Sequence, residues 1–137
     1  MAYPYGNFLY DSARQSFAEG GIHWLTDNIY AVLLTTGYVP NQATHQYLSS
    51  ASAYIWSDPT LLALKSAYGG VVDAEDTVFL LVDPGSVDAI LLYKDLGSPS
   101  VSPLIAYIDN ATTLPFTATG GNISVSWDGG ANKIFKL

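Results

Sequence analysis

The sequence predicts a mainly β protein, a sandwich or barrel of short strands behind a short N-terminal helix. Two observations carry this prediction: runs rich in branched and aromatic residues recur along the chain, and turn signals built on Gly, Pro, Asn or Asp separate them. The length of 137 residues fits one domain. We therefore expect a single domain over residues 1–137, with an arm and helix over 1–21 and the β-sandwich over 22–137.

The first expected element is a helix that ends at Gly20-Gly21, because glycine accepts the left-handed conformation common after a helix. Asn7 is the expected cap of this helix. The residues that recur at helical spacing on one face are Phe8, Leu9, Ala13 and Phe17.

A buried strand is expected over residues 29–35, where branched and aromatic residues are concentrated. The region 36–70 is the least regular. Within it we expect a helical turn inside 44–52, a short strand over 53–56 and a brief turn at Asp58-Pro59.

From residue 71 onward the chain is predicted to be almost wholly β. The turn signal Asp83-Pro84-Gly85-Ser86 ends one expected strand. A tight loop at Asp128-Gly129-Gly130 predicts that the last two strands pair as a hairpin. The expected strands span residues 77–82, 87–94, 104–108, 123–127 and 133–137.

Charge excludes some classes of partner. Five basic residues stand against twelve acidic ones, and the basic residues are scattered. We therefore expect no nucleic-acid binding and no attraction to anionic membranes. The longest apolar run, residues 29–34, is far too short to span a bilayer, which predicts a soluble protein.

Catalytic motifs are scarce, and the sequence predicts that the protein is not an enzyme and uses no cofactor or metal. The absence of cysteine excludes thiolate catalysis and Cys-ligated metals. His23 and His45 are interpreted as structural or hydrogen-bonding residues. The acidic pair Asp73 and Glu75 is interpreted as part of a solvated turn; a glycan-hydrolysing enzyme that uses these two acids is the third-ranked hypothesis.

Aromatic residues point toward protein contacts. The chain has ten tyrosines and three tryptophans, and tyrosine is enriched at interfaces because its ring buries area while its hydroxyl tolerates water. We take as candidate contact residues four tyrosines that lie outside the predicted strands and helix: Tyr3, Tyr5, Tyr38 and Tyr47.

Most of the chain is covered by a series of stretches that occur in this order: the N-terminal helix, Trp24, residues 26–35, 38–45, 89–95 and 102–109, and the pair Ser126-Trp127. Together they resemble a family of small structural proteins of tailed bacteriophages. The stretch 47–71 departs most from the family, so the resemblance says nothing about contacts made there.

The resemblance implies a jelly-roll-like β-sandwich that acts as a capsid decoration, or cement, protein. Such a protein is made in the host cytoplasm, binds the major capsid protein on the outside of the virion and bridges neighbouring capsomers. We expect a homodimer or homotrimer, because homo-oligomers usually have closed symmetry. The alternative hypothesis is a tail or fibre component that acts as a host-surface adhesin.

Overall fold

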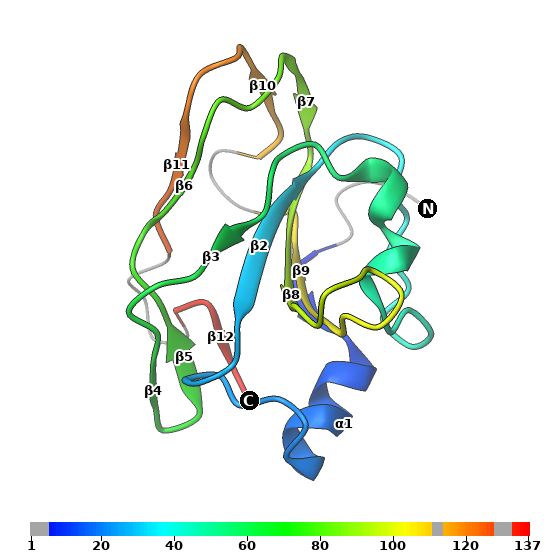
Figure 1. The fold of residues 1–137 in the computed structure, drawn as a ribbon, viewed down its shortest axis with the longest axis vertical. Helices are drawn as coiled ribbons and strands as arrows, with labels where there is room; N and C mark the ends of the chain where they lie inside the picture. The colour runs from blue at the N-terminus through cyan, green and yellow to red at the C-terminus, as the bar shows by residue number, and fades with distance from the viewer. Residues whose placement is uncertain (1–5, 111–113, 128–132) are drawn as a thin grey trace.

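The computed structural model describes residues 6–110, 114–127 and 133–137, and these confirm the mainly β class (Figure 1). Five strands form the largest sheet, in the order β1-β9-β8-β2-β3, and every neighbouring pair is antiparallel. Their bounds are β1 Phe8–Leu9, β9 Leu104–Ile108, β8 Ala89–Lys94, β2 Ile29–Leu34 and β3 Thr60–Leu61.

Three smaller antiparallel sheets lie on one side of the large sheet, to the left of β2 and above it in Figure 1. They pair β10 with β7, β11 with β6, and β12 with β5 and β4. The bounds are β10 Phe116–Ala118, β7 Gly85–Val87, β11 Ile123–Val125, β6 Thr77–Phe79, β12 Phe135–Lys136, β5 Val71–Asp73 and β4 Ser66–Tyr68.

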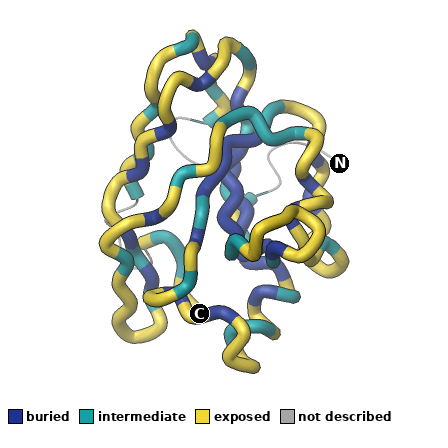
Figure 2. The backbone as a smooth tube through the Cα atoms, in the orientation of Figure 1, coloured by how far each residue is buried: buried dark blue, intermediate teal, exposed yellow. Residues whose placement is uncertain are grey.

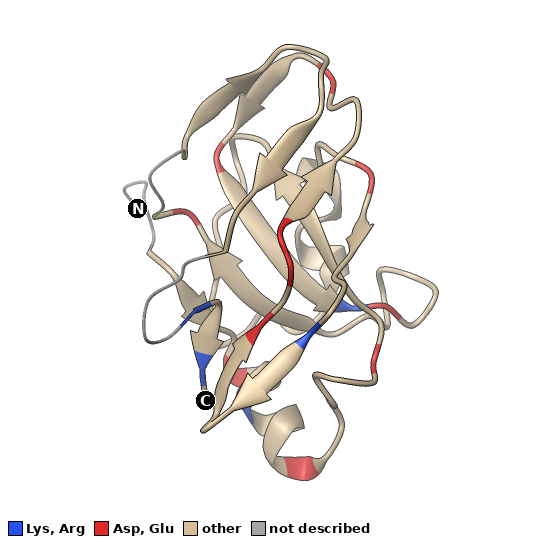
Figure 3. Ribbon diagram, turned by 90° about the vertical axis from the view of Figure 1, so that its left-hand side faces the viewer, with Lys and Arg blue, Asp and Glu red and all other residues tan. Residues whose placement is uncertain are grey.

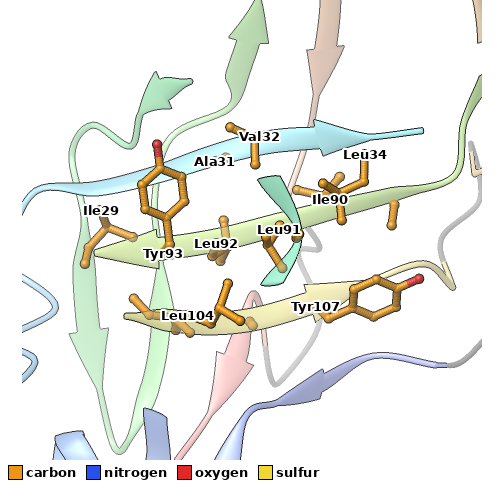
Figure 4. Packing of buried hydrophobic residues seen from close by; sticks show 14 of the residues in the cluster. Ile29, Ala31, Val32, Leu34, Ile90, Leu91, Leu92, Tyr93, Leu104 and Tyr107 are labelled. Atoms are coloured by element: carbon orange, nitrogen blue, oxygen red, sulfur yellow. The ribbon is translucent and has the colours of Figure 1, made fainter. Parts of the chain in front are cut away.

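The core lies along β2, β8 and β9, whose residues are almost all buried (Figures 2 and 4). These strands are apolar on both faces because the smaller sheets cover one face, while α1 and the 3-10 turns lie on the other side (Figure 1). Leu33, Leu91 and Ile105 are completely buried. Burying each such side chain contributes about 1.5–3 kcal/mol, so these three strands form the stable frame of the molecule.

The N-terminal helix is confirmed, but it begins later than expected. Helix α1 spans Asp11–Glu19, and its cap position is Tyr10, not Asn7. Gly20 ends it in the left-handed conformation, with φ of 79°, as the sequence predicts. Phe8 and Leu9 form strand β1 against β9 instead of the first helical turn. These two residues pair with the sheet instead of extending the helix, and this pairing places Leu9 in the core.

The irregular region contains two 3-10 helices, Leu48–Ser50 and Ser52–Tyr54. The first confirms the helical turn expected inside 44–52. The short strand expected over 53–56 is wrong, because only a single bridge between Ile55 and Leu34 forms there. The chain then runs alongside β2 and pairs with it as β3.

The expected C-terminal hairpin is also wrong. Strand β11 pairs with β6, and β12 pairs with β5, so the last two strands belong to different sheets. The loop expected to join them, 128–130, lies outside the described residues. Upstream, the strand expected over 77–82 ends at Phe79, and the one expected over 87–94 divides into β7 and β8.

Candidate interaction surface

Exposed apolar side chains are concentrated in one part of the chain. Of the twelve large hydrophobic residues exposed in the described structure, six fall between residues 61 and 81. This stretch therefore supplies half of the exposed large hydrophobic side chains of the described structure, and exposed apolar side chains that lie together mark contact surfaces. The six residues are Leu61, Leu64, Tyr68, Val78, Leu80 and Leu81.

Strand alternation explains the exposure of one member of this set. Along β6, Thr77 and Phe79 are buried whereas Val78 is exposed. Strand β3 lies next to β6, since the hydroxyl of Thr60 donates to the carbonyl of Val78 at 3.5 Å, and Leu61 is exposed as well. Two neighbouring strands of different sheets therefore each carry an exposed apolar side chain.

Two of the exposed leucines adopt a backbone conformation that leucine normally avoids. Leu64 has φ of 50° and is 80% exposed, and Leu81 has φ of 47° and is 74% exposed. The left-handed region costs a residue with a Cβ about 1–2 kcal/mol. Burial within the chain does not offset this cost at either position. Such strain at exposed positions is characteristic of functional sites.

Leu81 lies on a groove of about 380 Å³ between residues 55–58 and 80–83. Trp56 forms one wall: its indole N–H donates to the carbonyl of Asp83 at 2.9 Å, and its ring lies directly against Gly85. A Cβ at Gly85 would stand 2.5 Å from this ring, so only glycine permits the contact. We call this feature the leucine groove, after Leu80 and Leu81 on its wall.

Tyr38 is a core residue, not the surface contact that the sequence predicts. It is only 6% exposed, and its hydroxyl lies 2.8 Å from that of Tyr10 and 2.9 Å from Nδ1 of His45. Burial raises the pKa of both tyrosines above the ordinary value. Their rings therefore belong to the packing between the large sheet and the loop that follows β2.

His45 is a hydrogen-bonding residue, as interpreted from the sequence. The backbone N–H of Asn41 donates to Nδ1 at 3.2 Å, and the ring stacks against Tyr38. Partial burial lowers the pKa of His45 below its ordinary value, because a charged imidazolium would lose hydration there.

Tyr47 is exposed, and its role as a contact residue stays a prediction. It is 43% exposed and lines an open groove of about 450 Å³ between α1 and residues 43–47. Gln15 and Gln46 are among the polar residues of this groove. The two other candidate contacts, Tyr3 and Tyr5, lie outside the described residues.

The chain that follows these two tyrosines is attached to the large sheet. The N–H of Gly6 donates to the carboxylate of Asp109 at 2.8 Å. The side-chain oxygen of Asn7 accepts from the N–H groups of Asp109 and Asn110, and its amide donates to the carbonyl of Asn110. From Gly6 onward, therefore, the chain folds back onto the end of β9.

The two acidic residues considered for catalysis lie in different surroundings. Asp73 is half-buried, and its carboxylate lies 3.8 Å from the ammonium group of Lys133. Glu75 is exposed in the connection between β5 and β6. Within the described residues, no group of three or more acidic or histidine side chains is placed to hold a metal ion. None of the described helices has the length and apolar character needed to cross a bilayer.

Sequence reasoning missed the leucine groove because it treated 77–82 as one continuous strand. A signal was nevertheless present. Phe79 is buried, Leu80 and Leu81 are both exposed, and Val82 is buried again, which breaks the strict alternation of a strand. In the sequence, the consecutive leucines Leu80-Leu81, followed by Val82 and then the Asp83-Pro84-Gly85 turn, mark the place of this break.

Comparison with protein-family models gives no match, and comparison with curated proteins gives none either.

Proposed function

We propose that this protein is a structural component of a tailed-phage virion that binds the outside of the head and bridges capsomers. The observation that carries the proposal is the concentration of exposed apolar side chains between residues 61 and 81, in a chain with only 12% charged residues. A partner that covers these side chains removes them from water, which lowers the free energy of the complex. The resemblance to small phage structural proteins supplies the identity of the partner, the major capsid protein.

The physical role would be to add contact area between shell subunits. A protein that binds the assembled shell and not its free subunits stabilises the shell by mass action. Several symmetric copies would reinforce each other through avidity. A dimer or trimer fits this role, and sedimentation of the purified chain measures which of them forms.

The decisive experiment locates the protein on intact particles. The chain contains no cysteine, so Ser100→Cys introduces a single thiol in the exposed loop after β8. Virions that carry this variant, labelled with maleimide-gold, should show gold over the head. Gold confined to the tail would contradict the proposal and favour the second candidate, a host-surface adhesin.

A specific observation keeps the adhesin as that second candidate. Trp56 and the carboxylates of Asp58 and Asp83 share the leucine groove. The accessible lining of the groove is mostly polar, so a ligand rich in hydroxyl groups could donate hydrogen bonds to these carboxylates. Binding of host-surface glycans to the groove, together with gold on the tail, would support the adhesin.

A further inference from the structure

The leucine groove carries acidic side chains and no basic ones. Asp58 and Asp83 line it, and both are exposed. Figure 3 shows the face of the molecule that includes β6 and β4. The β6–β7 connection lies in the upper half of this view, where all the charged residues are acidic. Every Lys and Arg lies in the lower half.

Three of the five basic residues are engaged elsewhere. Lys65 donates to the carbonyl of Asp27, Lys94 pairs with the carboxylate of Asp27 at 3.1 Å, and Lys133 lies near Asp73. Arg14 lies on α1 and Lys136 lies on β12. Both elements lie in the lower part of the molecule in Figure 1, away from the groove. Asp58 and Asp83 therefore have no cationic partner among the described residues.

The groove is also shaped before any partner arrives. The hydrogen bond from Trp56 to Asp83 and the contact of its ring with Gly85 join the two walls. On the other wall, the side-chain oxygen of Asn122 accepts from the N–H of Leu81 at 2.9 Å and holds the left-handed turn. A site held in this way loses little conformational entropy on binding.

We propose that the leucine groove docks a segment of another protein in which apolar side chains alternate with Lys or Arg. The apolar side chains would cover Leu80 and Leu81, and the cationic groups would pair with Asp58 and Asp83. This inference rests on the proposed function, which makes the occupant a basic, apolar segment of the shell protein.

Charge complementarity selects this occupant over a second copy of the chain. A symmetric dimer through this groove would place Asp58 and Asp83 against the same residues of the other copy, in a chain of net charge −7. Like charges facing each other oppose association. An anionic membrane is disfavoured by the same sign.

The test uses defined peptides and the full chain labelled with ¹⁵N. An extended peptide of alternating leucine and lysine, added to about 1 mM, should shift the amide resonances of residues 55–58 and 80–83. The leucine–glutamate peptide and the serine–lysine peptide should leave these resonances unchanged. Equal binding of the leucine–glutamate peptide, or no binding of the leucine–lysine peptide, would overturn the inference.

A substitution at Leu81 separates the groove from general stickiness. Leu81→Asn removes the apolar side chain and keeps the backbone, because asparagine tolerates the left-handed region better than leucine. We expect the leucine–lysine peptide to bind about tenfold more weakly. Leu64→Asn is the matched control, since Leu64 is also exposed and left-handed but does not line the groove. Equal loss in both variants would contradict the assignment.

The contribution of the acidic side chains to binding is tested separately, through a change at Asp83. Asp83→Asn keeps the backbone carbonyl that accepts from Trp56, so it removes only the carboxylate charge. Binding should weaken about threefold and become less sensitive to salt. An unchanged salt dependence would contradict the role of Asp83. Groove resonances that shift on concentrating the chain alone would show self-association and overturn the choice of partner.

Binding to intact heads distinguishes this inference from the proposed function. If heads bind the original chain and Leu81→Asn equally, the groove assignment fails while the head-binding function stands. If heads bind neither, although the leucine–lysine peptide occupies the groove, the proposed function fails while the chemistry of the groove stands.

Discussion

The hydroxyl groups of Tyr10 and Tyr38 lie 2.8 Å apart in the interior, and the chain of hydrogen bonds continues to His45. The N–H of Asn41 also points at Nδ1 of His45, which makes this nitrogen an acceptor. Tyr38 must then donate to His45, and Tyr10 must donate to Tyr38. The arrangement requires a neutral imidazole and ties the loop after β2 to the start of α1.

The first prediction concerns Tyr38. Tyr38→Phe removes the acceptor for the buried hydroxyl of Tyr10 and the donor to His45. Leaving a buried hydroxyl unpaired costs about 1–3 kcal/mol, so the variant should melt several degrees lower. Thermal unfolding measures this loss. The control is Tyr47→Phe at the exposed tyrosine, which should change stability by less than about 0.5 kcal/mol. Equal effects in the two variants would contradict the buried hydrogen-bond chain.

The second prediction concerns pH. The pKa of His45 is lowered in the folded protein, so the unfolded chain binds more protons just below pH 6.5. The contribution of His45 is therefore fully present above about pH 6.5 and is lost as the pH falls toward the lower, folded value. His45→Gln should flatten the fall in stability over this interval. An NMR titration of the folded protein with a His45 midpoint at or above 6.5 would contradict this reading.

The strongly patterned part of the fold could be predicted from the sequence. Residues 29–34 and 104–108 form strands as expected. Both stretches are rich in branched and aromatic side chains, which favour buried strands. Gly20 ends α1 because it alone accepts the conformation there at no steric cost. Local patterns succeed where a single local preference decides the structure.

Partner choice at long range could not be predicted. Asn7 is a good helix cap locally, yet its side chain binds residues more than one hundred positions away. Tyr38 lies outside the predicted strands, so from the sequence we expect it to be an exposed contact residue. It is buried instead, and its hydroxyl lies within hydrogen-bonding distance of the hydroxyl of Tyr10. The leucine groove is formed by residues 55–58 and residues 80–83. The sequence pattern of either segment does not indicate that the other segment lies beside it.

The third prediction concerns the C-terminal strand. Phe135 on β12 contacts both Phe17 and Trp24, with ring centroids 6.0 and 5.3 Å apart. Phe135→Ala should cost about 2 kcal/mol, less than the roughly 3–5 kcal/mol typical of a fully buried phenylalanine, because Phe135 is half-buried. Chemical denaturation measures the change. Lys136→Ala on the same strand is the control and should have little effect, since Lys136 is exposed.

Removal of residues 133–137 tests the same strand more severely. Deletion removes β12 and leaves one edge of β5 without its partner strand. The truncated chain should fail to unfold cooperatively, or should melt well below the parent chain. Cooperative melting at the parent temperature would show that β12 contributes nothing to the fold.

The last prediction separates two roles for Asn7. Serine caps helices about as well as asparagine, so Asn7→Ser would be nearly silent if Asn7 were a helix cap. In the structure, however, the longer amide side chain spans the N–H groups of Asp109 and Asn110 and the carbonyl of Asn110. Serine has no amide donor and a shorter reach, so we expect a loss of about 1 kcal/mol, the typical net value of a hydrogen bond. Equilibrium unfolding measures this loss.

The matched control for Asn7 is Asn28→Ser, at an exposed asparagine in the turn before β2. This change should alter stability by less than about 0.5 kcal/mol, as expected at an exposed position. Hydrogen exchange adds a local readout. Asn7→Ser should speed exchange at the N–H groups of Asp109 and Asn110, because these groups donate directly to the Asn7 side chain. Unchanged exchange at both positions would contradict the attachment of residues 6–7 to the end of β9.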